Sequence, residues 1–528
     1  MSSFKTIFTN KNLFLFGLVL IVVGMPLSRF FMSLGQFVLL GNWILEGEFK
    51  RKGQIIKTSK VLWVLCSFYL LHLIGLFYTT DFNYALNDLR IKLPLLWFPL
   101  LFATSMPLEK KEMDALINIF IASVFTASIV SIVVLLGYTK RKVVDIRDIS
   151  IFNSHIRFAL MIVLSICALL HDYLQTKKII HFILKAALIS WFIVFLCIME
   201  SLTGLVILSI VSLYLVSKNI KNNTHFLLRY SPIILYAGVA AFMLFLMKDE
   251  WNKFYNKNTT TITANFLDEK TANGNFYMHD TLLKSTENGN YVWYYCNYDE
   301  MKPVWNRRSK INFDSLDHKG NMVGFTLIRY LTSKGLKKDS LALASLQDDE
   351  IQKVEAGVSN YLYANTGSIR SRIHEVIWEY DNFINNSNPS GNSVFMRLEF
   401  WKTGLQIWKQ HPLTGVGTGD VQRAYNNQYI LSNSKLSKKW QLRSHNQFIA
   451  ILVSFGSIGL IVFIVWLIYP AVAIKKKHAL FYLFFIIALL SMLNEDTLET
   501  QAGVTFFGFF YALFLYNPSG TSAPSAKE

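Results

Sequence analysis

Long apolar stretches constrain this chain more than any other feature of its sequence. A helix that crosses a bilayer needs about 20 mostly apolar residues, and by that criterion the sequence contains about twelve spanning segments. Only 16% of the residues are charged and 52% are hydrophobic, whereas an ordinary soluble domain carries about 25% charged residues. We therefore predict an all-α polytopic membrane protein. The segments run roughly over residues 13–27, 30–45, 61–78, 91–106, 114–137, 156–174, 179–198, 202–217, 229–247, 446–469, 478–493 and 503–516.

These segments divide the chain into four parts. Residues 1–247 hold nine predicted spans, 248–445 form one large polar loop domain between the ninth and tenth spans, 446–516 hold three more spans, and 517–528 are a tail. Only Pro26–Arg29 separates the first two segments, so these could also form one broken helix, which would reverse the orientation of everything that follows. The apolar stretch that starts at Leu13 leads directly into the next and has no small-residue cleavage site, so we expect a retained helix rather than a signal peptide.

The positions of Lys and Arg predict the orientation, because short cytoplasmic loops are enriched in these residues. With the N-terminus inside, and with the tail inside as well, the inner loops hold the basic clusters at 50–60, 110–111, 177–178, 218–229 and 475–477. One predicted outer loop does not follow this rule, because it carries Lys140, Arg141, Lys142, Arg147 and Arg157. Either the topology is wrong there or these cations have a function on the outer face. The formal net charge of +17 then reflects attraction to anionic lipid, and we expect no nucleic-acid partner.

The large segment at 248–445 is polar and rich in aromatic residues. The stretch NGNYVWYYCNYDE could offer aromatic faces to sugars or to a membrane interface, or it could form the small core of a folded excursion. Residues 340–383 have helical patterning, and NNSNPSGN at 385–392 is typical of a loop. A further helix is predicted over 397–410, with Leu398, Trp401, Leu405 and Trp408 on one face and a stop at His411–Pro412.

Several common catalytic motifs are missing. The sequence has no Walker A loop, no HExxH, no paired CxxC and no DxD triplet that would chelate a metal–diphosphate. GVGTGD at 415–420 is superficially similar to a dinucleotide loop, but it follows no predicted strand, so we interpret it as a tight turn whose Asp420 caps the next helix. The four cysteines suggest neither a disulfide nor a metal site.

One histidine and several carboxylates lie at the predicted outer face. His445 opens the helix HNQFIAILVSFGSIGLIVF, and a histidine at the membrane boundary titrates near neutrality, so it could take a proton from a hydroxyl. It could equally be an interfacial histidine bonded to the backbone. Glu495, Asp496 and Glu499 in the last outer loop, and Glu200 in an outer turn, could orient an arginine or histidine or bind acceptor hydroxyls, or they could simply be solvated.

Five cations lie close to the same predicted boundary. They are Arg397, Arg157 and Arg443, with Arg90 and Lys92 just before the fourth span. Arginine binds phosphate oxygens bidentately, so such a cluster could hold a lipid diphosphate and stabilise it as it leaves. For each of them, anchoring to lipid headgroups is an alternative.

The segment RLEFWKTGLQIWKQHPLTGVGTGD followed by RSHNQFIAILVSFGSIGL resembles the signature region of the O-antigen ligase and polymerase superfamily. The resemblance is supported by the arrangement of about twelve spans with one large outer loop before the tenth. It implies a GT-C-type membrane glycosyltransferase that needs no metal or other cofactor. It also implies that His445 is the general base and that Arg397 matches the arginine that heads the loop helix.

The resemblance further implies a donor, an acceptor and a location. The donor would be a glycan on undecaprenyl diphosphate at the periplasmic face of the bacterial inner membrane, and the acceptor of a ligase would be a lipid A-core sugar. Many family members place an arginine in a Ser–Arg–Gly-like turn near the diphosphate. This chain has Glu200–Ser201–Leu202–Thr203–Gly204 there, so Arg157, Arg90 or Lys92 would have to substitute.

Other functions remain open at this point. A polymerase would use a second lipid-linked glycan as acceptor, and a protein O-oligosaccharyltransferase would use Ser or Thr. A transporter of lipid-linked sugars would fit a chain of about twelve spans as well. A transporter should, however, carry charged or broken helices near the midplane and an inverted repeat, and the polar groups here gather at one face.

Overall fold

The computed structural model describes residues 10–139, 146–173, 179–220, 226–255, 268–363, 369–386, 390 and 393–518. The cations at 140–142, the inner pair at 177–178 and most of the tail at 517–528 lie outside these residues, as does the side chain of Arg147. The chain divides into two compact units. The first comprises residues 1–215, 400–434 and 441–528, and the second comprises 216–399 and 435–440.

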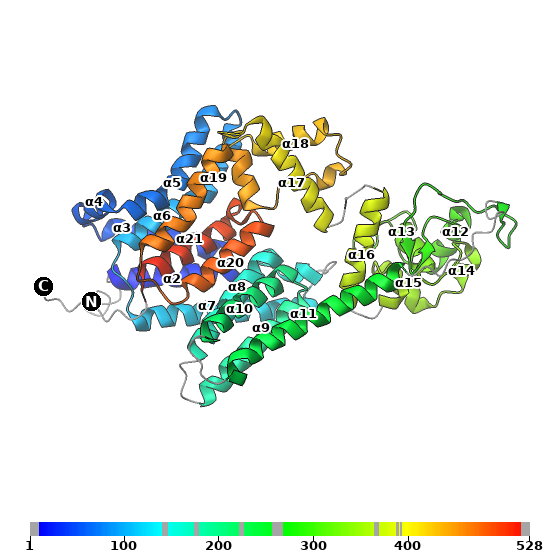
Figure 1. The fold of residues 1–528 in the computed structure, drawn as a ribbon, viewed down its shortest axis with the longest axis horizontal. Coiled ribbons are helices and arrows are strands. Elements are labelled where there is room, and N and C mark those ends of the chain that lie inside the picture. Colours follow the sequence, from blue (N-terminus) through cyan, green and yellow to red (C-terminus); the bar gives the residue numbers. More distant parts are fainter. Residues whose placement is uncertain are drawn as a thin grey trace. The chain divides into compact units, whose positions relative to one another are not determined.

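Most of the apolar helices belong to the first unit (Figure 1). Every one of the twelve predicted spanning segments lies on helical structure, with differences of up to three residues at the ends. The elements in or entering the first unit are α2 (Asn10–Leu27), α3 (Arg29–Leu45), α4 (Phe49–Thr58), α5 (Lys60–Ile74), η1 (Gly75–Tyr78), α6 (Phe82–Thr104), α7 (Lys110–Leu135), η2 (Ile146–Ile149), α8 (His155–Tyr173), α9 (Ile179–Ile198), α10 (Leu202–Ile220), α17 (Ser393–Gln410), α18 (Val421–Leu431), α19 (Gln447–Ala473), α20 (Phe481–Asn494), η6 (Thr497–Glu499) and α21 (Gln501–Tyr516).

Five helical segments in the described parts of the chain are long and apolar enough to cross a membrane. They are Asn10–Leu27, Lys60–Tyr78, Lys110–Leu135, Ile179–Ile198 and Gln447–Ala473. Four further apolar helical segments are shorter, namely His155–His171, Leu202–Leu215, Phe481–Asn494 and Gln501–Tyr516. Length and composition therefore identify an all-helical, multi-pass membrane protein.

The first two apolar segments form a hairpin of two separate helices. Ser28 caps α3, accepting a hydrogen bond from the backbone N–H of Phe31. Glycines bring the two helices close together, because a Cβ on Gly24 would lie 2.2 Å from the backbone nitrogen of Met32 and one on Gly17 would lie 2.7 Å from Leu39. Small residues at a helix interface permit this approach in a membrane. The alternative of one broken helix is therefore not what the chain adopts.

Helix α21 is the core of the first unit. Every residue from Ala502 to Leu515 is buried, and α21 packs against α6, α20 and α2. Aromatic side chains fill the interfaces, as in the edge-to-face pair of Phe98 and Phe509. A helix that is apolar on all sides is buried inside a protein, so α21 is surrounded by other helices of this unit rather than by lipid.

The glycine-rich segment GVGTGD packs into a break in α19. Gly456 in α19 has a φ of 63°, which is in the left-handed region that glycine tolerates. The freed carbonyls of Val453 and Ser454 accept hydrogen bonds from the N–H groups of Val416 and Gly417, both at 2.9 Å. The predicted turn is confirmed as an irregular loop, and its glycines allow close approach of backbone to backbone.

The predicted capping role of Asp420 is wrong. Asp420 stands at the N-cap position of α18 but makes no side-chain capping bond. Its carboxylate instead accepts hydrogen bonds from the N–H and hydroxyl of Thr80, both at 2.8 Å, and from the N–H of Asp81 at 3.2 Å. Thr80 and Asp81, which follow η1, offer these three donors close together. Asp420 therefore holds the glycine-rich loop against the segment after η1.

The second unit has its own small core. Its elements are α11 (Phe226–Tyr255), β1 (Thr286–Glu287), β2 (Asn290–Tyr291), α12 (Tyr298–Arg308), α13 (Val323–Ser333), α14 (Ser340–Ala344), α15 (Asp348–Glu355), η4 (Tyr361–Tyr363), α16 (Ile369–Asn386) and η5 (Lys438–Trp440). Val292, Cys296 and Trp305 are almost fully buried in this core. The aromatic stretch at 290–335 thus serves largely as the core of a folded excursion, and the helical patterning over 340–383 is confirmed.

Helix α17 runs from Ser393 to Gln410, so it starts four residues earlier than predicted and ends where predicted. The predicted apolar face is wrong, because Leu398 and Leu405 are exposed while Phe400 and Ile407 are buried. The reason is Gly404, where a Cβ would lie 2.4 Å from the hydroxyl of Tyr425 and 2.6 Å from Ile449. Close packing at a glycine selects the face that apolar periodicity alone would not select.

Candidate functional site

His445 occupies a strained position at the start of α19. Its φ is 46°, a left-handed conformation that is uncommon for residues other than glycine. The next residue, Asn446, caps α19 through its side-chain oxygen, which accepts from the N–H groups of Phe448 and Ile449. The amide of Asn446 also donates to the carbonyl of Leu493 at 2.9 Å. These bonds hold the strained turn, and strain of this kind is concentrated at functional sites.

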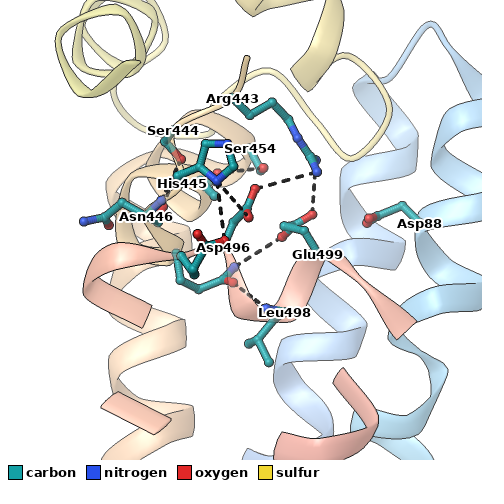
Figure 2. Close-up of polar contacts among 12 residues, drawn as sticks. Asp88, Arg443, Ser444, His445, Asn446, Ser454, Asp496, Leu498 and Glu499 are labelled. Carbon is teal, nitrogen blue, oxygen red and sulfur yellow. Dashed lines mark hydrogen bonds and ion pairs between the residues drawn. The ribbon is translucent and has the colours of Figure 1, made fainter. Parts of the chain in front are cut away.

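The imidazole of His445 faces two carboxylates of the loop between α20 and α21 (Figure 2). Its Nδ1 lies 3.4 Å from Oε2 of Glu495 and 4.0 Å from Oδ1 of Asp496. The side chain of His445 is 31% exposed, whereas those carboxylates are 12% and 10% exposed. The ring thus reaches solvent on one side and is held by acidic groups on the other. Of the roles that the sequence left open for the acidic residues, contact with a histidine is the one seen here for Glu495 and Asp496.

Glu499 is the centre of an ion network behind this histidine. Its carboxylate pairs with Nζ of Lys92 at 2.9 Å and with Nη1 of Arg443 at 3.4 Å. Lys92 also pairs with Asp88 of the same helix at 2.5 Å, and Arg443 lies 3.7 Å from Asp496. Figure 2 shows Arg443 between the carboxylates of Asp496 and Glu499. Two of the predicted phosphate-binding cations, Arg443 and Lys92, are therefore engaged with carboxylates of the protein itself.

Burial and charge act in opposite directions on these groups. Burial alone would raise the pKa of Glu499, but Lys92 and Arg443 lower it to about 2. Burial outweighs the attraction of Arg443 at Asp496, so the pKa of that carboxyl is raised. Burial would lower the pKa of Arg443, but the negative charge of Glu499 raises it. Glu499 and Arg443 are therefore both charged at neutral pH.

The remaining predicted cations lie in three different settings. Arg157, near the start of α8, donates to the hydroxyl of Ser154 at 3.0 Å, and the charges of Glu495 and Asp496 act on it. Its Nε is buried and has no hydrogen-bond partner among the described residues. Arg90 is exposed and donates to Asn87 at 2.8 Å. Arg397 is half-buried on α17 and belongs to the second unit.

The outer turn with Glu200 adjoins the acidic loop. Glu200 has a φ of 51° and is exposed. In the same turn, the hydroxyl of Thr203 accepts a hydrogen bond from the amide of Asn494 at 3.0 Å. A Cβ on Gly204 would lie 2.9 Å from the Cβ of Ala159 on α8, two residues after Arg157. The turn, the acidic loop and the start of α8 are thus neighbours within the first unit.

Three residues of this network were missed by sequence reasoning. The buried amide of Gln447 accepts from the N–H of Leu498 at 2.7 Å and donates to Glu499 at 3.2 Å. Tyr84 accepts from Arg443 at 2.8 Å. Asp88 was detectable, because it precedes Lys92 by four residues and such pairs meet on one face of a helix. No comparable signal identifies Tyr84 or Gln447.

One group in the described part of the chain has the composition of a metal site. Ligand atoms of His445, Glu495 and Asp496 all lie within 4.8 Å of one another. One imidazole nitrogen and two carboxylates suit a divalent cation. The same three groups also suit proton transfer, because a carboxylate beside an imidazole orients the ring and stabilises its protonated form.

Comparison with known proteins identifies the part of the chain that carries this histidine. Residues 345–464 match the protein-family model described as O-Antigen ligase. The chain carries an O-antigen ligase domain. The matched part of this domain includes Arg397, Arg443 and His445, whereas Lys92 and the acidic loop at 494–500 lie outside it. No curated protein matches the chain.

Proposed function

We propose that the chain transfers a glycan from undecaprenyl diphosphate to an acceptor hydroxyl, with His445 as the general base. The observation that carries this proposal is the pairing of His445 Nδ1 with Glu495 at 3.4 Å in a partly exposed turn. The matching O-antigen ligase domain supports a glycosyltransferase of the ligase or polymerase type. The acidic loop then has the role of orienting the base.

The chemistry follows from the positions of the two groups. The carboxylate of Glu495 beside Nδ1 favours the tautomer with its proton on Nδ1, which leaves the lone pair on Nε2. Nε2 takes the proton of the acceptor hydroxyl as its oxygen bonds to the anomeric carbon. The bond between that carbon and the phosphate oxygen breaks, and undecaprenyl diphosphate leaves with the electron pair. Attack opposite to the leaving group inverts the anomeric configuration.

Arginines stabilise the diphosphate as it leaves. Arg157 is supported by its buried Nε without a hydrogen-bond partner among the described residues, and Arg397 by its place in the matched domain. Arg443 and Lys92 already neutralise Glu499 and Asp88, so we assign them the role of holding the acidic loop. Arg90 and Glu200 line the outer face, where they contact donor or acceptor.

The acceptor that we propose is a lipid A-core sugar, which makes the enzyme a ligase. The described helices are compatible with a GT-C-type membrane fold of about twelve spans, located in the bacterial inner membrane with its active site on the periplasmic side. A lipid-linked glycan would make it a polymerase and a Ser or Thr side chain an O-oligosaccharyltransferase, with the same base and leaving group. A transporter would instead move a lipid-linked sugar across the membrane without changing any covalent bond.

The decisive experiment compares His445→Ala with wild type in a deletion strain. Loss of a general base costs roughly 10²- to 10⁴-fold in rate, so transfer should almost vanish while folded protein remains. His318→Ala in the second unit is the matched control, because that histidine is exposed. Full activity of His445→Ala in correctly inserted protein would refute the proposed base.

The same strains distinguish the acceptors. A ligase leaves full-length glycan on undecaprenyl diphosphate when it is lost, and long lipopolysaccharide disappears. Unchanged lipopolysaccharide with loss of protein-linked glycan would indicate a protein acceptor. Arg397→Lys keeps the charge but loses the bidentate fork, so a large defect relative to Arg307→Lys, an exposed arginine of the second unit, would support contact with phosphate.

A further inference from the structure

A cavity of about 540 Å³ lies in the first unit, between the end of α17, the glycine-rich loop and α18. Ligand sites in proteins typically measure about 300–1,000 Å³. The glycine-rich loop forms part of its wall, and the proposed chemistry at His445 does not use it. Its polar lining includes Tyr78, Gln410, Thr414, Arg423, Asn427 and Gln428.

The lining combines apolar side chains, such as Ile407 and Leu431, with polar ones, and its acid and its arginine balance each other. Arg423 and Asp420 lie 3.4 Å apart, so their charges compensate. Asp420 is further held by the N–H and hydroxyl of Thr80. A phosphate or diphosphate would require uncompensated positive charge, and a lipid tail would leave the amides of Gln410 and Asn427 facing hydrocarbon. A neutral ligand rich in hydroxyl groups satisfies this lining best.

Three amide side chains lie in the wall, those of Gln410, Asn427 and Gln428. Gln410 donates to Gln428 at 2.8 Å, and Gln428 donates to Gln406 at 3.0 Å. This chain of bonds fixes the orientation of the amides before any ligand arrives. An amide both donates and accepts, as a sugar hydroxyl does, so an ordered row of amides suits a sugar ring.

An aromatic ring completes the wall. Tyr78 ends η1, and its hydroxyl donates to the carbonyl of Thr414 at 3.0 Å. The ring is 39% exposed and is anchored by this bond. A tyrosine offers an apolar ring face and a polar hydroxyl. A pyranose likewise has an apolar C–H face and polar hydroxyl groups.

The two helices that border the cavity, α17 and α18, also contact the segment that carries His445. Phe400 on α17 lies against the ring of His445, with ring centroids 5.7 Å apart, and ten residues later the same helix reaches Gln410, about 15 Å along its axis. On α18, Tyr429 donates to the carbonyl of Leu442 at 2.6 Å, close to His445 in the chain. A glycan that reacts at His445 can therefore extend along α17 into this cavity.

We propose that the cavity between α17 and α18 binds a neutral sugar unit of the glycan, away from the bond that reacts. The inference rests on the proposed function, because it takes the glycan to be the substrate. The bound sugar anchors the chain through the amides of Gln410, Asn427 and Gln428, and it packs on Tyr78. The site gives preference among glycans without taking part in proton transfer.

The test measures binding directly with full-length protein in nanodiscs. The probe is the glycan released by mild acid from the undecaprenyl diphosphate fraction of the deletion strain, and saturation-transfer NMR gives its Kd. Asn427→Ala removes one amide from the wall and should raise the Kd about 2- to 12-fold, the effect of losing a neutral hydrogen bond. Asn426→Ala is the matched control, because Asn426 is the exposed neighbour on α18 that does not line the cavity.

A cavity-filling variant gives the second measurement. Ala424 lines the cavity, so Ala424→Phe should abolish binding while the melting temperature stays close to that of wild type. His445→Ala should bind the released glycan as wild type does. No binding by wild type at millimolar glycan, or equal Kd values for all variants, would overturn the cavity site. Normal transfer by His445→Ala would instead overturn the proposed base, whatever the Kd values.

Discussion

Replacing Glu499 by glutamine removes the charge on which the buried ion network depends. Glu499 is 10% exposed, and its partner Lys92 is 2% exposed. After the change, Lys92 retains only Asp88 as a carboxylate partner among those it contacts, and Arg443 retains only Asp496 at 3.7 Å. Breaking a buried ion pair on one side costs about 3–5 kcal/mol, because a charge stays buried without its counter-ion.

The pKa of Glu499 gives the pH dependence of this effect, because Lys92 and Arg443 lower it in the folded chain. Because the pKa is lowered on folding, this stabilisation is complete above pH ~4.3 and is lost as the pH falls towards 2. We expect Glu499→Gln to lower the melting temperature by roughly 5 °C at pH 7, and the difference from wild type should shrink only below pH ~4.3.

The assay is thermal unfolding of the detergent-solubilised chain, followed by tryptophan fluorescence, at several pH values. The matched control is Glu109→Gln, since Glu109 forms an exposed pair with Lys11 at 2.7 Å and is itself 53% exposed. Surface pairs of this kind contribute about 0–1 kcal/mol. Equal melting temperatures for the two variants, or a difference from wild type that persists at pH 2, would refute the reasoning about the network.

Three other predictions concern the loop and the site. Gly456→Ala should destabilise the protein strongly, because its φ is 63° and a Cβ would lie 2.3 Å from the backbone of Leu413; Gly53→Ala, where the Cβ meets nothing within 4 Å, should leave the melting temperature almost unchanged. Asp420→Ala removes the acceptor of three hydrogen bonds and should cost about 3 kcal/mol in a chemical-denaturation measurement. Treatment with EDTA should leave glycan transfer unchanged, and recovery of lost activity by added Mg²⁺ or Mn²⁺ would instead assign an ion to the group formed with His445.

Sequence reasoning predicted the helices well, because apolar runs of spanning length have few alternative structures. It also named His445, Glu495 and Asp496 as candidates at one predicted face, with the orientation of an arginine or histidine as one of several possible roles for the carboxylates. The positions of spans in sequence thus bring distant polar residues together before any contact is known.

Sequence reasoning was less successful where tertiary packing decides between similar local choices. The buried face of α17 depends on a close approach at Gly404, and apolar periodicity does not encode it. Asp420 accepts a hydrogen bond from the backbone N–H of Thr80, just after η1, because the fold places that donor beside it. Tyr84 and Gln447 join the network through contacts across 359 and 52 residues of sequence, and no local pattern indicates these.

The central place of α21 also determines how the protein is made. This helix follows in the sequence all of the helices that it packs against, α2, α6 and α20 among them. During synthesis those helices enter the membrane while the space for α21 is still vacant, so lipid or a helper protein must cover their inward faces for that time. Closure of this part of the bundle therefore waits until α21 is inserted, and His445 and the acidic loop, which directly precedes α21, come together at that step.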